Sequence, residues 1–335
     1  MRRIVTPGRL LVVGLALLAV VLALMLVPSN EVIFLPDTAH PVAPLVSFPG
    51  ARDPKTGGVY FVDVFERKAT LLERLFGGLH EGADLYPAGA VNPPGVGDNQ
   101  RRLIDQQDMH RSQVIAAAVA LKAAGKHVTI SPIGALVDGA EPGKPAVGKL
   151  DPDDVIVAVN GKPVRTPAGL FSAMSHVRIG DTVRFTIRRG NQTLVERIRT
   201  VTSDQPPKRA VVGVFVEPAI DIHLPFPVRI NAGNVGGPSA GLAFALEVLQ
   251  ELGHNVLHGR KIAATGELAP DGSVRPIGGV KQKTIGAREA GVDAFLVPAG
   301  DNAVEARKYA HGLRIIPVES FQQALRALAT LGPTT

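Results

Sequence analysis

A glycine-rich loop that runs straight into an apolar helical pattern is the feature that most restricts how this chain can fold. The loop Asn231–Gly241 reads NAGNVGGPSAG, and Leu242, Leu246 and Leu249 then fall on one face of a helix. A helix with such a face packs into a core, so it would hold Ser239 rigidly at its start. Unpaired backbone N–H groups and the positive dipole end favour negative charge beside the serine hydroxyl. The stretch therefore predicts a nucleophilic serine beside an oxyanion site.

The residues around this loop alternate between strand and helix patterns, which predicts an α/β domain over 208–335. The expected strands are 210–216, 220–230, 261–268, 294–297 and 313–318, and the expected helices after the serine helix are 280–290, 302–309 and 321–331. Only 4% of the 335 residues are aromatic while 45% are hydrophobic, so Val, Ile, Leu and Ala must build the cores. A chain of this length should form two or three compact units.

A second loop-to-helix junction, Gly278–Lys283, supplies lysines downstream of the serine. Serine needs a base to become a good nucleophile, and a lysine can be that base at neutral pH if burial lowers its pKa. Ile285 and neighbouring alanines would turn Lys283 inward. Lys281 would project about 200° away around the helix, so only one of the two lysines can face Ser239.

Three motifs carry a family resemblance. They are Gly236–Gly241 (GGPSAG), Ala264–Glu267 (ATGE) and Pro276–Lys283 (PIGGVKQK). In this order they resemble the proteolytic domain of the Lon family, which implies a catalytic dyad of Ser239 and Lys283, with Thr265 orienting the lysine by a hydrogen bond. The N–H groups of Gly237 and Ser239 are the expected oxyanion donors. Gly236 stands where many members have an acidic residue, so no role of that acid is transferred.

Residues 127–203 combine short strands with one helix, which predicts a small, mainly β domain. The run Gly148–Val164, GKLDPDDVIVAVNGKPV, resembles the PDZ domain, with Asp153 at a position that usually holds glycine. The resemblance implies that a peptide or a protein C-terminus adds to a sheet edge. The expected carboxylate-binding loop comprises Gly134, Ala135, Leu136 and Val137. A docking spacer without an open groove is the alternative.

The uninterrupted apolar run Leu10–Val27 predicts a membrane anchor, since at about 1.5 Å per residue it just reaches across a bilayer core of about 30 Å. A cleaved signal peptide is the alternative. Arg2, Arg3 and Arg9 precede the run and predict a cytoplasmic N-terminus over 1–9. The expected location is the plasma membrane, crossed once, with the catalytic domain extracytoplasmic.

Residues 28–126 predict no chemistry. They read as a membrane-proximal tether, rich in Pro and Gly over 35–58, followed by a strand, a short helix and a second helix. The expected bounds of these elements are 59–65, 68–76 and 109–124. His80 and His110 have no spaced partners and are expected to be surface residues.

Together the segments resemble bacterial membrane-anchored Lon-like proteases with a PDZ domain. The sequence contains no G-x-x-x-x-G-K-(S/T) motif, so an ATPase module is not supported. The resemblance implies an ATP-independent serine endopeptidase that cleaves extended or unfolded polypeptides, and assembly into a ring, often a hexamer. No cofactor and no metal are expected.

The composition excludes several classes of function, and a second motif adds an alternative enzyme class. The absence of cysteine excludes thiol nucleophiles and disulfides, and a net charge of +6 without a long basic run gives no nucleic-acid footprint. The segment Gly237–Gly241 also fits the nucleophile elbow of α/β-hydrolases, which would need His311 and Asp293 as partners in an esterase triad. That motif requires a strand directly before the elbow, where this chain has a Gly/Asn segment. A catalytically inactive scaffold is the third possibility.

Overall fold

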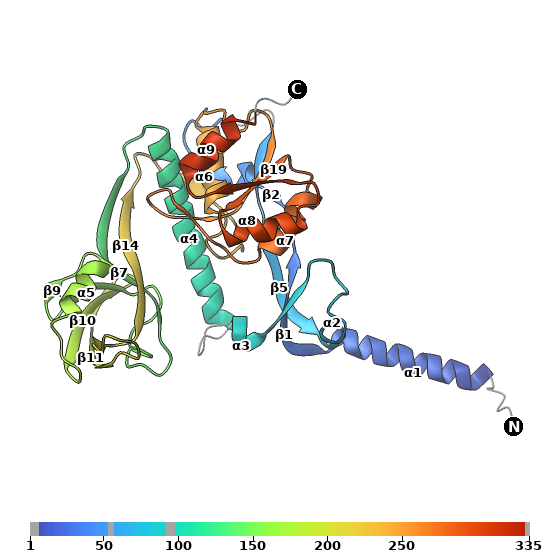
Figure 1. Ribbon diagram of the computed structural model, residues 1–335, viewed down its shortest axis with the longest axis horizontal. Coiled ribbons are helices and arrows are strands. Elements are labelled where there is room, and N and C mark those ends of the chain that lie inside the picture. The colour runs from blue at the N-terminus through green and yellow to red at the C-terminus, as the bar shows by residue number, and fades with distance from the viewer. Residues whose placement is uncertain (1–6, 53–56, 92–97, 332–335) are drawn as a thin grey trace. The chain divides into compact units, whose positions relative to one another are not determined.

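The computed structural model describes residues 7–52, 57–91 and 98–331 (Figure 1). The contacts divide the chain into two compact units, which we describe separately. The first unit contains the residues up to Asp98, Asp108–Ala120 and the residues from Val228 onward. The second contains Asn99–Gln107 and Leu121–Pro227. Of the predicted cytoplasmic segment 1–9, residues 1–6 lie outside the described residues.

The centre of the first unit is a five-stranded sheet in the order β2-β4-β16-β19-β20. Its strands are β2 (His40–Pro41), β4 (Gly58–Phe61), β16 (Lys261–Ala264), β19 (Ala294–Pro298) and β20 (Arg314–Val318). The last four run parallel, and β2 pairs antiparallel with β4. Strands such as AFLVP are apolar throughout because a parallel sheet is covered on both faces.

Four helices cover this sheet (Figure 1): α6 (Gly241–Glu251), α7 (Val280–Glu289), α8 (Asp301–Tyr309) and α9 (Phe321–Ala329). Val280 and Ala287 of α7 share a core with Phe295 of β19 and with Ala303 of α8. Helix α6 is buried along almost its whole length and packs against β4 and β16. The α/β character predicted for the C-terminal region is therefore confirmed.

The N-terminal segment is part of this unit and does not form a separate tether. Strands β1 (Pro28–Pro36), β5 (Val64–Thr70) and β6 (Asp84–Pro87) form an antiparallel sheet, and β3 (Val46–Ser47) pairs with β15 (Arg229–Ile230). The remaining short elements are η1 (Ala43–Leu45), α2 (Leu71–Leu75), α3 (Ala88–Val91), β17 (Glu267–Leu268) and β18 (Val274–Arg275). The predicted tether over 35–58 is wrong for the described residues of that range, because Val46–Ser47 pairs with β15 and His40–Pro41 pairs with β4.

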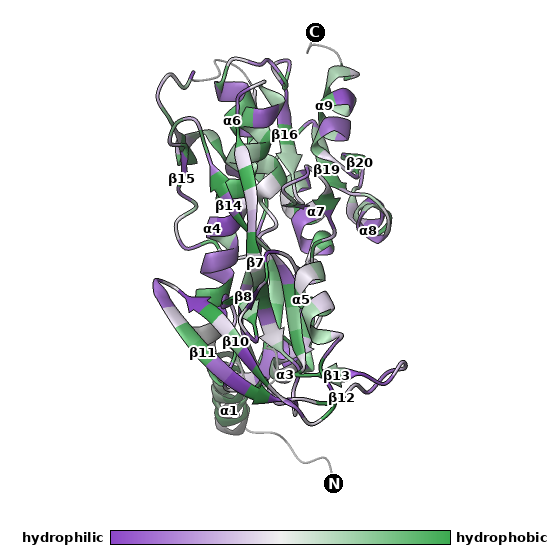
Figure 2. Ribbon diagram, turned by 90° about the vertical axis from the view of Figure 1, so that its left-hand side faces the viewer, coloured by the Kyte–Doolittle hydropathy of each residue, from purple (hydrophilic) through white to green (hydrophobic). Residues whose placement is uncertain are grey.

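The second unit is a mainly β domain with a sheet in the order β11-β10-β8-β7-β14. Its elements are β7 (Thr129–Ala140), β8 (Val155–Val159), β9 (Lys162–Pro163), α5 (Pro167–Met174), β10 (Thr182–Arg189), β11 (Gln192–Arg199), β12 (Val201–Thr202), β13 (Ala210–Val211) and β14 (Val214–His223). Hydrophobic and hydrophilic residues alternate along β10 and β11 (Figure 2), and Phe185 and Ile187 point into the core. Asp153, at the usual glycine position, has φ of 68°, a left-handed conformation that Asp tolerates better than most residues.

Strand β14 lies in the second unit, whereas the sequence predicted strands over 210–216 and 220–230 in the proteolytic domain. It pairs antiparallel with β7 along ten residues, from Val214↔Ala140 to His223↔Thr129. Strand propensity identified the extended backbone, but propensity does not indicate which sheet a strand joins.

Two further helices were predicted from the sequence. The structure confirms the first as a helix but does not support the second as a membrane anchor. The helix predicted over 109–124 is present as α4 (Asp98–Ala123), closed by Gly125 with φ of 72°. The apolar run forms α1 (Pro7–Leu26), and the chain becomes extended at Pro28. Among the described residues no helix combines the length and apolar character needed to cross a membrane, so the predicted anchor over 10–27 is not supported.

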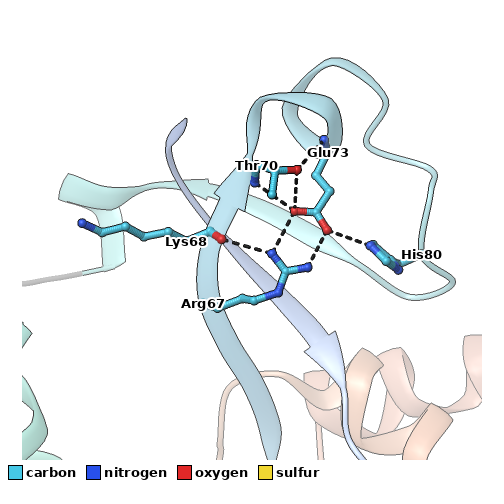
Figure 3. A network of polar contacts seen from close by, with 5 residues as sticks. All are labelled: Arg67, Lys68, Thr70, Glu73 and His80. Carbon is cyan, nitrogen blue, oxygen red and sulfur yellow. Dashed lines mark hydrogen bonds and ion pairs between the residues drawn. The ribbon is translucent and has the colours of Figure 1, made fainter. Parts of the chain in front are cut away.

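A buried carboxylate fixes the turn between β5 and α2 (Figure 3). Glu73 accepts hydrogen bonds from the Thr70 backbone N–H and from Arg67 Nη1, both at 2.9 Å, and it lies 2.7 Å from His80 Nε2. Thr70 in return accepts from the Glu73 N–H, which completes a capping box at the start of α2. The Arg67 guanidinium lowers the pKa of Glu73 well below its usual range.

Glu73→Ala is expected to lower the free energy of unfolding by about 2 kcal/mol, because it leaves the capping N–H and the guanidinium without their acceptor. Because the pKa of Glu73 is lowered in the folded state, this contribution is complete above about pH 5. It begins to decline below the ordinary glutamate pKa of about 4.3 and is lost as the pH falls through the lowered pKa of the folded state. Urea unfolding at pH 7 and pH 3.5 measures both effects. Lys68→Ala is the matched control, since only its backbone carbonyl joins the network. An equal loss in both variants would contradict the assignment.

Candidate active site

Ser239 lies in the loop before α6 and is held there by its own backbone. Its carbonyl accepts hydrogen bonds from the Gly266 N–H at 2.8 Å and from Thr265 Oγ1 at 3.1 Å. Gly237 has φ of 81°, a left-handed conformation that favours glycine. The first helical residue is Gly241, so the serine precedes the helix by two positions and projects from a fixed turn.

Helix α4 fixes the same loop from another direction. The buried Ser112 hydroxyl donates to the Pro238 carbonyl at 3.0 Å. A Cβ at Gly241 would lie 2.8 Å from Ser112 Oγ, which explains why glycine follows Ala240 at the start of α6. Sequence reasoning missed Ser112 because no motif distinguishes it from other helical serines.

Lys283 meets Ser239 directly: its Nζ lies 2.7 Å from Ser239 Oγ. The lysine is on α7, which starts after Gly279 (φ of 68°), and only 5% of its surface is exposed. Burial lowers the pKa of Lys283 to about 8, partly offset by the negative charge of Asp63. A substantial fraction of the amine is therefore neutral near pH 8 and can accept a proton.

Lys281 faces a different partner, as the helical spacing predicted. Its Nζ donates to Asp84 Oδ1 at 2.9 Å and to the Ala83 carbonyl at 3.1 Å. The adjacent Gln282 side chain donates to Asp84 Oδ2 and to the Gly82 carbonyl. These bonds tie α7 to residues 82–84 through side chains other than Lys283.

A group of three side chains lies beside α7. His40 Nε2 is 3.8 Å from Asp37 Oδ2 and 3.6 Å from Asp63 Oδ1. In the part of the chain that the structure describes, this is the one set of His, Asp and Glu side chains that converges closely enough to offer three donors. Because the histidine is within ion-pair distance of both carboxylates, we interpret the group as an ion-pair network and assign no metal to it.

The expected oxyanion donors are available. Among the described residues, the N–H groups of Gly237 and Ser239 donate to no protein acceptor. Both belong to the turn that presents the serine hydroxyl. A negatively charged oxygen formed on a substrate beside Ser239 could therefore accept from them.

Two predicted site features differ in the structure. Thr265 donates to the Ser239 carbonyl, so its observed hydrogen bond supports the nucleophile's backbone, whereas a bond to the lysine was predicted. The esterase partners do not gather at the serine: Asp293 is exposed and accepts from the Lys261 N–H at 2.7 Å, and His311 is exposed in the turn after α8.

The prediction of a carboxylate-binding loop in the second unit is wrong, because the four residues belong to a paired strand. Gly134, Ala135, Leu136 and Val137 lie inside strand β7, paired on one side with residues 216–219 of β14. Ala135 and Leu136 pair on the other side with Ile156 and Val155 of β8. An interior strand has used its N–H groups in the two ladders, so this segment cannot hold a peptide carboxylate.

Comparison with known families supports both domains. Residues 198–330 match the Lon protease (S16) C-terminal proteolytic domain, and residues 104–200 match the PDZ domain. The chain therefore contains a proteolytic domain of the Lon serine protease class together with a PDZ domain.

Individual Lon proteases match about a third of the chain. Lon protease 2 of Bacillus subtilis (strain 168) is 35% identical over 114 residues, which are 34% of this chain and 20% of that protein. The Lon protease of Clostridium beijerinckii is 39% identical over 124 residues, 35% of this chain and 14% of that protein. The chain thus spans a fifth or less of these relatives. The PDZ domain of the SdrC-like protein from Listeria innocua is 22% identical and covers 25% of this chain and 92% of that structure, with a TM-score of 0.23.

Proposed function

We propose that this chain is a serine endopeptidase in which Ser239 is the nucleophile and Lys283 is the general base, and that it cleaves extended or unfolded polypeptides without ATP. The observation that carries the proposal is the 2.7 Å contact between Ser239 Oγ and the Nζ of a lysine that is almost completely buried. Burial gives that lysine the lowered pKa that a base needs near neutral pH.

The proposed reaction begins with neutral Lys283. Its Nζ takes the Ser239 proton while Oγ attacks the scissile carbonyl carbon, and the carbonyl oxygen becomes an oxyanion. The N–H groups of Gly237 and Ser239 donate to that oxyanion. When the C–N bond breaks, the Lys283 ammonium gives its proton to the leaving amine, and an acyl ester remains on Ser239.

The second half of the reaction reuses the same groups. Neutral Lys283 takes a proton from a water molecule, whose oxygen attacks the ester carbonyl. The new oxyanion collapses, the ester bond breaks, and the ammonium returns the proton to Ser239 Oγ. A carboxylic acid product leaves, and the enzyme regains its starting state without any external cofactor in the proton balance.

Two further parts of the proposal, an unfolded polypeptide as substrate and cleavage without ATP, are supported by the sequence and by the PDZ domain. The chain has no phosphate-binding G-x-x-x-x-G-K-(S/T) motif, which supports cleavage of polypeptides that are already unfolded. The PDZ domain supports recognition of an extended peptide by strand addition. Since β7 is paired on both sides, we assign this role to an outer sheet edge, formed by β14 or β11.

The test is incubation of the purified chain with an unstructured polypeptide such as casein, with and without ATP, followed by mass spectrometry of the products. We expect internal cleavage at equal rates in both samples. His311→Ala should retain the activity, because His311 lies outside the proposed site. Cleavage only with ATP would contradict nucleotide independence, and loss of cleavage in His311→Ala would favour the esterase-type triad.

A further inference from the structure

One face of α7 packs directly against the N-terminal segment. Gly279, Lys283 and Gly286 are spaced i, i+4 and i+7, so they share a helical face. A Cβ at Gly279 would lie 2.6 Å from Val64 Cγ2, and one at Gly286 would lie 3.0 Å from Val62 Cγ1 and would overlap the Asp37 carbonyl oxygen. The helix face that carries the lysine is therefore in close contact with the chain on both sides of position 63.

Asp63 sits between these two contacts, in the short connection from β4 to β5. Its side chain is 24% exposed, and its Oδ1 atom is buried without a hydrogen-bond partner among the described residues. A buried carboxylate oxygen that makes no hydrogen bond needs another source of stabilisation. His40 Nε2 lies 3.6 Å from this oxygen, and the amine of Lys283 acts on the carboxylate through its charge.

The two charges act on each other. Burial is the largest effect on both groups: it lowers the pKa of Lys283 and raises the pKa of Asp63. The charge of each group opposes the effect of burial on the other. Burial and the neighbouring Asp37 raise the pKa of Asp63, whereas His40 lowers it. Lys281 is held by Asp84 and forms no part of this group.

We propose that Asp63 is a positioning residue for Lys283: its carboxylate, supplied by the N-terminal segment, is the counter-charge of the ammonium that forms when Lys283 takes the serine proton. The inference rests on the proposed function and adds a residue outside the region that carries the three sequence motifs. An ammonium in a buried site is unstable without a compensating negative charge, so Asp63 stabilises the charge-separated states of both half-reactions.

Removing the negative charge of Asp63 should lower the pKa of Lys283. Without the carboxylate the Lys283 ammonium is less stable, so the pKa of Lys283 falls and the neutral base persists to lower pH. The acid limb of kcat/KM, expected near pH 8 in the unaltered protein, should move down by about one unit in Asp63→Asn. The high-pH plateau should fall by about tenfold, because a weaker base forms a less stabilised ammonium.

The experiment measures the pH dependence of kcat/KM from pH 6 to 10 for the full chain and three variants. Asp63→Asn removes the charge, Asp63→Glu restores it, and Asp37→Asn removes the farther carboxylate of the same network as the matched control. A second measurement, the pKa of Lys283 from its 13Cε resonance in a Ser239→Ala background, does not depend on activity.

The expected result is a lower acid limb and plateau in Asp63→Asn, recovery toward the original profile in Asp63→Glu, and an unchanged profile in Asp37→Asn. The inference is overturned if Asp63→Asn leaves the limb and the 13Cε titration unchanged, or if Asp37→Asn shifts them equally. Failure of the proposed function looks different, because the unaltered protein would then not cleave, while the 13Cε titration would still report whether Asp63 and Lys283 are coupled.

Discussion

Lys283→Met is expected to lower kcat/KM for peptide cleavage by about 10⁴-fold, with little change in KM. Methionine has nearly the length of lysine and fills the same apolar space, but it cannot accept the Ser239 proton. Burial of Lys283 makes this change compatible with the fold, since the variant removes a buried amine and Asp63 keeps His40 at 3.6 Å. Steady-state cleavage of a fluorogenic peptide, with circular dichroism to confirm folding, measures the effect.

Two controls make this result specific. Ser239→Ala should cost about as much as Lys283→Met, and the double variant little more than either, because the two side chains act in the same step. Lys281→Met changes a lysine on the same helix that pairs with Asp84, and it should retain most of the activity. Multiplicative losses in the double variant, or equal losses at 281 and 283, would contradict a dyad of Ser239 and Lys283.

Gly286→Ala is expected to lower the free energy of unfolding of the proteolytic unit by about 3 kcal/mol, at the upper end of the cost of overpacking. The added methyl group would overlap the Asp37 carbonyl oxygen and crowd Val62, so α7 or the N-terminal segment must move. Backbone cannot turn aside as a flexible side chain can. The gain in helix propensity from Gly to Ala, about 1 kcal/mol, offsets only part of this cost. Urea unfolding followed by circular dichroism measures the difference.

Gly278→Ala is the matched control for that experiment. Gly278 lies just before the same helix, has no atom within 4 Å of the added Cβ and does not have a left-handed φ. Its substitution should change stability by no more than about 0.5 kcal/mol. If both variants are equally stable, the packing of α7 against residues 37–64 is looser than the structure shows.

The sequence allowed much of the candidate site to be predicted because its chemistry is carried by local motifs. Ser239 was predicted from the loop that precedes an apolar helix. The helical period showed that only one of Lys281 and Lys283 can face Ser239, and the apolar neighbours of Lys283 together with the resemblance to the Lon proteolytic domain indicated which one. Asp63 and Ser112 could not be predicted in this way. Each reaches the site through packing between segments far apart in the chain, and a single aspartate or serine has no local pattern that records a distant neighbour.

In the fold, too, local patterns were predictable from the sequence, whereas the pairing of distant segments was not. The alternation of strands and helices after residue 208 predicted an α/β domain, but it placed the segment now seen as β14 in the wrong sheet. Residues 28–126 were predicted to be a membrane-proximal tether with a strand and two helices, although β4 from this segment lies beside β16 in the central sheet. Short strands carry little information about their partners, since pairing depends on which edges and apolar faces remain open after the rest of the chain has folded.

The sequence by itself determined the elements whose cause is local: the turn that presents Ser239, the helix face that carries Lys283, and the alternating strands of the second unit. Only the tertiary structure decided how these parts combine. It brought Lys283 Nζ to Ser239 Oγ, closed the edge of β7 with β14, and inserted the N-terminal segment against α7. The reason is physical: conformational preference acts over a few neighbouring residues, whereas burial and charge compensation act between surfaces that meet only in the folded protein.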